Sequence, residues 1–209
     1  MKELILVRHG QSEHHIKGLT GGWTDTPLTP LGCQQAAATA QRLVSLIQSK
    51  PLRFYCSDLI RAKKTAEIIG DTLGVTPVAT EALRELNWGI VKDMTLEEAR
   101  SLELPRTTPL IDWVTFPGAE TRRQLYHRTT QFLVQLNPNF HGCTLIVSHG
   151  NAITSIIQWW LELAEHQQSR IAFDKAPCSI THLHLNEWDQ KTIAKLNDTG
   201  HLDAISDEA

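Results

Sequence analysis

Three apolar runs of the chain end in residues that can bind an anion. These residues are Arg8-His9-Gly10 after ELILV, Ser57 and Arg61 after RFYC, and Ser148-His149-Gly150-Asn151 after TLIV. Guanidinium groups bind phosphate oxygens through paired hydrogen bonds, and backbone N–H groups at a helix start add further donors. The residue types therefore predict a phosphate-binding pocket with two arginines and two histidines.

The same residues predict a reaction at phosphorus. Two arginines beside His9 are expected to lower its pKa from the usual value of about 6.5. The neutral imidazole then keeps a lone pair and can attack phosphorus, which makes His9 the predicted nucleophile. A leaving alcohol needs a proton, for which a carboxyl group is the usual donor. Glu85, in the segment LRELNWG at residues 83–89, is the predicted donor.

The elements that must position these residues alternate along the chain. Strands are predicted at 3–7, 53–57, 144–148, 179–185 and 192–196, and helices at 31–49, 58–73, 95–103, 120–136 and 152–163. Repeated strand-helix order predicts an α/β fold, a three-layer α/β/α sandwich with a mostly parallel central sheet. Ligands of such sheets bind beyond the carboxyl ends of the strands, which is where the anion-binding residues fall.

Length and composition exclude several other classes. The chain has 209 residues, and one domain over 1–209 is expected, with 203–209 as a frayed tail. The formal net charge of -3, without a basic tract, gives no reason to expect nucleic acid. No apolar run approaches the roughly 20 residues of a membrane span, so a cytoplasmic protein is expected. The four separated cysteines form no CxxC pair and are expected to be reduced.

Seven segments spread from Leu6 to Leu202 carry a family resemblance. They are LVRHGQSE, GGWTDTPLTPLG, CSDLIRAKKTAEII, LRELNWG, FPGAET, LIVSHGN and NDTGHL. In this order they resemble the histidine phosphatase superfamily, of phosphoglycerate mutase-like fold, and its small phosphatase branch. The resemblance implies catalysis without metal or other cofactor. It also implies that His9 is phosphorylated, that Arg8, Arg61 and His149 bind the phosphoryl group, and that Glu85 is the acid and then the base.

The resemblance also implies a set of phosphate or substrate contacts, and the chain departs from the family pattern at two places. The implied contacts are Ser12, Gly21, Gly22, Ser57 and Asn151. His15 stands where the family commonly has asparagine, and it either donates to phosphate or turns aside. His14 is expected to be a solvated loop residue. In the segment IVKDMT, Lys92 either recognises a second acidic group or is a surface lysine.

Three functions agree with this pattern. The first is hydrolysis of a small phosphomonoester through a phosphohistidine, and the second is a phosphoglycerate mutase that uses the same nucleophile. The short chain and the stretch ELNWG, which lacks the tyrosine typical of glycolytic mutases, favour the phosphatase. The third is a non-catalytic sensor of a phosphorylated ligand. The sequence leaves the substrate and the oligomeric state open.

Overall fold

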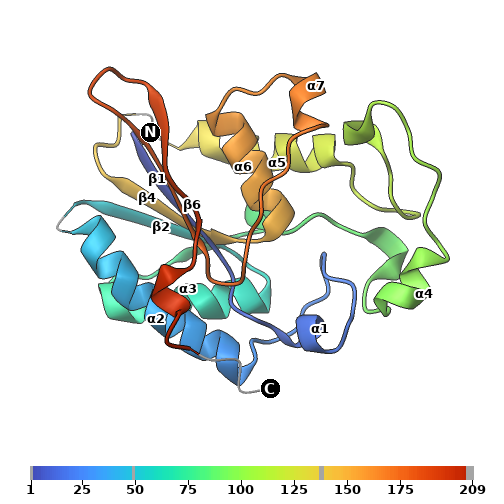
Figure 1. The fold of residues 1–209 in the computed structure, drawn as a ribbon, viewed down its shortest axis with the longest axis horizontal. Helices are drawn as coiled ribbons and strands as arrows, with labels where there is room; N and C mark the ends of the chain where they lie inside the picture. Colours follow the sequence, from blue (N-terminus) through green and yellow to red (C-terminus); the bar gives the residue numbers. More distant parts are fainter. Residues whose placement is uncertain (1, 49, 137–138, 206–209) are drawn as a thin grey trace.

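The centre of the structure is one six-stranded sheet in the order β3-β2-β4-β1-β5-β6 (Figure 1). The structure is a computed structural model that describes residues 2–48, 50–136 and 139–205. Its strands are β1 (Glu3–Arg8), β2 (Leu52–Ser57), β3 (Val78–Thr80), β4 (Cys143–Ser148), β5 (Ile180–Leu185) and β6 (Lys191–Asp198). Strands β1 to β4 are parallel, whereas β5 is antiparallel to β1 and β6. The predicted mostly parallel sheet is confirmed.

Two pairs of helices cover the two faces of the sheet (Figure 1). The pairs are α2 (Pro30–Ile47) with α3 (Ile60–Leu73), and α5 (Arg122–Gln135) with α6 (Gly150–Trp160). Within β1, Ile5 and Val7 face the first pair and Leu4 and Leu6 face the second, all without exposed surface. Burial on both faces explains why this strand is a continuous apolar run.

The ends of the longer helices follow local chemistry. Thr29 caps α2, since its hydroxyl accepts a hydrogen bond from the Gly32 N–H at 3.0 Å, and Pro30 takes the first helical position. Gly74 ends α3 in the left-handed conformation, with φ of 68°. Helix α6 ends at Trp160, before the predicted residue 163, and Glu162 has a φ of 54°.

Several short elements lie beyond the carboxyl ends of the parallel strands. Helices α1 (Glu13–Ile16) and α4 (Leu96–Arg100) are on this side of the molecule (Figure 1), and a bridge between Leu19 and Thr95 joins their segments. The sequence did not predict α1, β3 or α7 (Glu165–Gln168), because three or four residues are too few to show periodicity.

The cysteines, the helices and the end of the chain were each the subject of an expectation from the sequence. The four cysteines are free. Over the described ranges, the helices are all too short or too polar to cross a bilayer. Of the predicted frayed tail, 203–205 form turns and bends, and 206–209 lie outside the described residues.

Candidate active site

The register of the sheet brings the two predicted histidines together. Arg8 on β1 is paired with Ser148 on β4, and the backbone N–H of His9 donates to the Ser148 carbonyl at 2.9 Å. Each histidine is therefore the first residue beyond its strand. Their ring centroids lie 5.0 Å apart.

The hydrogen bonds of His9 fix which ring nitrogen is free to react. Its Nδ1–H donates to the Gly10 carbonyl at 2.8 Å, so the lone pair is on Nε2, where the Nε–H of Arg61 donates at 3.2 Å. His9 is only 2% exposed. Burial, and next the charge of Arg61, lower the pKa of His9 well below 6.5, so its imidazole is neutral at physiological pH. A neutral, oriented imidazole is a competent nucleophile.

The loop that follows β1 packs directly on the start of α2, at Gly10 and Gly32. A Cβ at Gly10 would lie 2.5 Å from the Gly32 carbonyl oxygen, and one at Gly32 would lie 2.0 Å from the Gln11 oxygen. Only glycines allow this approach of two backbones. The Gly10 N–H also donates to Thr65 Oγ1 at 3.1 Å.

Arg61 is 1% exposed and is held by neutral groups. Besides its bond to His9, it donates to the carbonyls of Thr24 at 2.5 Å and Gly22 at 2.7 Å. A guanidinium has five N–H groups, so two remain for a ligand. Arg61 thus both orients the nucleophile and fixes the turn at Gly21 and Gly22, which the sequence placed near the substrate.

Arg8 and His149 carry buried polar atoms without a partner among the described residues. These atoms are Arg8 Nε and His149 Nδ1. His149 Nε2 is 2.8 Å from Ser57 Oγ, and if that hydroxyl donates, Nδ1 carries the proton. Burial, and next the charge of Arg61, lower the pKa of His149 well below 6.5. Unpaired buried donors are rare, and an anion would satisfy both of these.

His15 stacks against His9, with ring centroids 5.6 Å apart, and its ring nitrogens face two donors. Nδ1 lies 3.1 Å from the Ser12 N–H, and Nε2 lies 2.9 Å from Arg8 NH2. These contacts require opposite tautomers, because a neutral imidazole accepts at only one nitrogen. Burial, and next Arg8, lower the pKa of His15 to about 4. If Nδ1 accepts from Ser12, the Nε2–H of neutral His15 is a further donor beside Arg8.

The expectation that His14 is a solvated loop residue is wrong. His14 is 6% exposed, in α1, and its Nδ1 lies 2.9 Å from Ser12 Oγ and 3.1 Å from Thr26 Oγ1. Burial lowers its pKa to about 3. His14 also lies under Gly21, where a Cβ would come within 3.5 Å of its Nε2. Ser12, a predicted substrate contact, therefore makes hydrogen bonds to His14 and His15.

The ring nitrogens of His9, His14 and His15 lie within 4.8 Å of one another, a spacing that invites comparison with a metal site. Two of these nitrogens already face guanidinium groups, His9 Nε2 at 3.2 Å and His15 Nε2 at 2.9 Å. A dication there would meet two positive charges at close range. The charge of the pocket favours an anion.

The carboxylate of Glu85 lies at the N-terminal end of α6, the helix that begins directly after His149. Its Oε1 accepts from the Leu86 N–H at 2.7 Å, and both carboxylate oxygens accept from the Asn151 N–H at 3.1 Å. Glu85 as a whole residue is 9% exposed. Asn151 thus contacts Glu85 through its backbone N–H. This N–H lies in the first turn of α6, where the helix dipole favours a negatively charged group.

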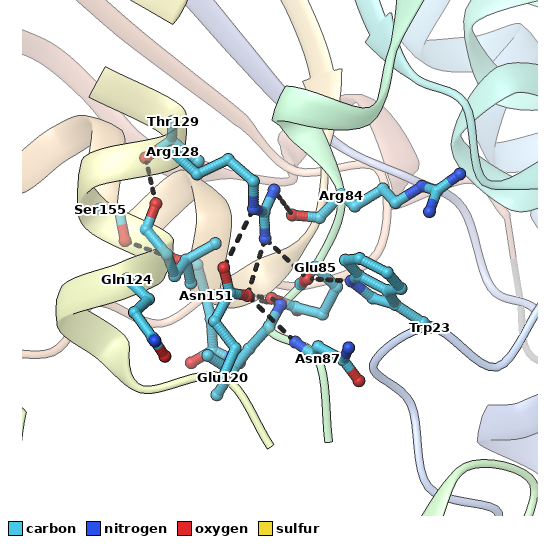
Figure 2. A network of polar contacts seen from close by, with 12 residues as sticks. Trp23, Arg84, Glu85, Asn87, Glu120, Gln124, Arg128, Thr129, Asn151 and Ser155 are labelled. Carbon is cyan, nitrogen blue, oxygen red and sulfur yellow. Dashed lines mark hydrogen bonds and ion pairs between the residues drawn. The ribbon is translucent and has the colours of Figure 1, made fainter. Parts of the chain in front are cut away.

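A network behind Glu85 holds its backbone in place (Figure 2). The Glu85 carbonyl accepts from Trp23 Nε1 at 2.7 Å and from Arg128 NH2 at 3.2 Å. Arg128 NH1 also donates to the carbonyls of Glu81, Ala82 and Arg84. Arg128 pairs in turn with Glu120 at 2.8 Å. One side chain thus fixes four carbonyls of the segment that ends in the predicted acid.

Sequence reasoning missed part of this arrangement. It quoted FPGAET and LRELNWG as motifs, but did not identify Glu120 or Arg128 as the link between them. Arg128 is one helical turn after buried Leu125, at the edge of the apolar face of α5, which indicates a partly buried arginine but does not identify the carbonyls that it contacts. Lys92 is exposed.

Comparisons with known proteins agree with this geometry. The family model described as "Histidine phosphatase superfamily (branch 1)" matches residues 4–199. The chain is 31% identical over 211 residues to "Putative phosphoserine phosphatase 2" of Hydrogenobacter thermophilus, covering 96% of this chain and 98% of that protein. It is 29% identical to "Probable phosphoglycerate mutase GpmB" of Yersinia pestis, covering 97% and 96%.

A solved structure extends the likeness to the fold. The phosphoserine phosphatase of Entamoeba histolytica, in complex with 3-phosphoglyceric acid, has a TM-score of 0.77 at 26% identity. The match covers 97% of this chain and all of that one.

Proposed function

Because the chain belongs to the histidine phosphatase superfamily, branch 1, we propose that it hydrolyses a small-molecule phosphomonoester, without metal, through a phosphohistidine at His9. The observation that carries the proposal is the orientation of the His9 ring. Nδ1–H is bound to the Gly10 carbonyl, and the Nε2 lone pair faces Arg61 in a pocket with unpaired buried donors.

The first step transfers the phosphoryl group to His9. Nε2 attacks phosphorus, the bond to the leaving oxygen breaks, and Glu85 gives that oxygen its proton. Arg8, Arg61 and His149 hold the phosphoryl oxygens, whose charge they stabilise in the transition state. Asn151 and Leu86 orient the Glu85 carboxyl group for this transfer through their backbone N–H groups.

The second step releases phosphate. Glu85, now ionised, takes a proton from water, the water oxygen attacks phosphorus, and the bond to His9 Nε2 breaks. The same carboxyl group thus serves both steps, which explains why its backbone is so firmly held.

A phosphoglycerate mutase is the second candidate. Its support is the similarity, at 29% identity, to a protein named as a probable mutase. Such an enzyme would return the phosphoryl group from His9 to a bound intermediate before water reacts. The relative named as a phosphoserine phosphatase supports hydrolysis at 31% identity.

One paired assay tests both. Purified wild type and His9→Ala, in EDTA, are given p-nitrophenyl phosphate, phosphoserine and 3-phosphoglycerate, the last with and without a bisphosphoglycerate primer. Phosphate release that disappears with His9 supports the phosphatase, and isomerisation faster than release supports the mutase. Tight ligand binding by a wild type that never forms phosphohistidine would leave a sensor and refute both.

A further inference from the structure

Lys175 is a half-buried cation that has no anionic partner among the residues that the structure describes. Its ammonium group donates to Thr154 Oγ1 at 2.6 Å, and no carboxylate of the described residues lies within 4.0 Å of it. Burial lowers the pKa of Lys175, while the charge of Glu85 opposes this effect. A half-buried ammonium group bound only to a hydroxyl leaves its charge available.

Lys175 also lies next to the predicted acid. A Cβ at Gly150 would be 3.6 Å from Glu85 Oε2 and 3.9 Å from Lys175 Cε, so both side chains flank the same glycine. The Lys175 carbonyl accepts a hydrogen bond from Arg8 NH1. The residue therefore touches the phosphoryl-binding arginine with its backbone and approaches Glu85 with its side chain.

Arg122 is a second cation without a partner within the described part of the chain. It is exposed at the first position of α5. It borders two hollows that both reach Asn151, and Lys175 borders one of them. The other hollow has a volume of about 280 Å³ and an aromatic wall of Trp88, Trp113 and Phe116.

We propose that Lys175 and Arg122 bind a carboxylate on the leaving group of the substrate, so that the substrate is a phosphorylated carboxylic acid. The inference rests on the proposed function, because the leaving oxygen must lie at Glu85 to receive its proton. A carboxylate on the carbon chain of the leaving group then reaches the hollow that Asn151, Arg122 and Lys175 all border.

Charge explains why two cations are needed at this place. Once Glu85 has given up its proton, it is ionised beside an acidic leaving group, and the two like charges repel each other. Lys175, which approaches the same glycine as Glu85, and Arg122 offset this repulsion. A neutral leaving group would leave half-buried Lys175 without a partner for its charge, which favours an acidic substrate over a neutral one.

The test compares ligands that differ only at the carboxylate. Phosphoserine is paired with phosphoethanolamine, and 3-phosphoglycerate with glycerol 3-phosphate. Dissociation constants are measured by calorimetry in a His9→Ala background, which prevents turnover. Lys175→Gln and Arg122→Gln each remove one charge, and Lys63→Gln is the control, since Lys63 is an exposed lysine on α3. Melting temperatures verify that the variants fold.

We expect the parent to bind each acid about tenfold more tightly than its partner, a typical value for a charge-assisted hydrogen bond. Lys175→Gln and Arg122→Gln should each lower this ratio, and Lys63→Gln should not change it. A ratio near one in the parent, a ratio insensitive to both variants, or no measurable binding of either acid overturns the inference.

The proposed function is judged separately. Hydrolysis of p-nitrophenyl phosphate that requires His9, with no preference for acids, would keep the phosphatase and remove the carboxylate site. A clear preference without any phosphohistidine would keep the site and remove the proposed reaction.

Discussion

Arg128→Met should separate the placement of Glu85 from the integrity of the fold. The substitution keeps an unbranched side chain but removes the hydrogen bonds to the carbonyls of Glu81, Ala82, Arg84 and Glu85. It also leaves Glu120 without its cation. The backbone of Glu85 then keeps only the bond from Trp23 behind it.

The expected loss of stability follows from the burial of the ion pair. Removing one partner of a fully buried pair costs about 3–5 kcal/mol. Because the Arg128 and Glu120 side chains are 21% and 13% exposed, we expect about 2–3 kcal/mol. For a chain of this length that loss lowers the melting temperature by about 5–10 °C. A displacement of Glu85 near 1 Å is expected to slow proton transfer about 100-fold.

The decisive assay is the single-turnover rate of His9 phosphorylation from two substrates, well below the melting temperature. p-Nitrophenolate leaves without a proton, whereas the serine oxygen of phosphoserine needs Glu85. Arg128→Met should therefore slow the phosphoserine reaction much more than the p-nitrophenyl phosphate reaction.

The double variant Glu120→Leu, Arg128→Met is the control for stability. Removing both charges should restore part of the melting temperature, since no unpaired charge remains, but it should not restore the phosphoserine rate. Equal slowing of both substrates, or recovery of the rate together with stability, would refute the positioning role.

Three further results are expected. Glu85→Gln should bind substrate but lose about 10²–10⁴-fold in turnover of phosphoserine; near-normal turnover would exclude Glu85 as the acid. The pKa values of His9, His14 and His149 are lowered in the folded chain, so below about pH 6.5 the unfolded chain takes up protons that the folded chain does not. The melting temperature should therefore fall from pH 7.5 to pH 5.0, and it should fall less in His14→Gln than in the wild type. A fall of the same size in both proteins would contradict this expectation. Gly32→Ala, with its Cβ 2.0 Å from the Gln11 oxygen, should reduce stability and activity together, and a wild-type melting curve would disprove the contact.

The elements and the centre of the site could be predicted because they depend on local patterns. ELILV and TLIV are apolar without alternation, as strands covered on both faces must be. Parallel strands end at the same edge of a sheet, so the residues after Arg8 and Ser148 had to meet. The roles of the individual residues at that edge remain proposals.

The surroundings of the site could not be predicted, because they depend on contacts between distant segments. Arg128 donates to carbonyls more than 40 residues away in sequence, and an arginine on an amphipathic helix usually faces solvent. Lys175 lies in an irregular segment without periodicity. His14 is covered in part by the 21–26 segment, which no local signal in EHH reveals.

The partners of the cations distinguish those that serve the fold from those that serve the ligand. Arg84, Arg123 and Arg128 are each paired with a carboxylate, so their charges are already neutralised. Arg8 and Arg61 are instead held by carbonyls and imidazoles, which orient a guanidinium without cancelling its charge. Such an arrangement keeps the positive charge for an anion. Lys175, which is half-buried and held by a hydroxyl, belongs by this criterion with the second group. Arg122 is exposed, as Lys63 is, so its assignment depends on the hollow that it shares with Lys175. In the proposed reaction, the positive charge available to a substrate therefore extends past the phosphoryl pocket toward the leaving group.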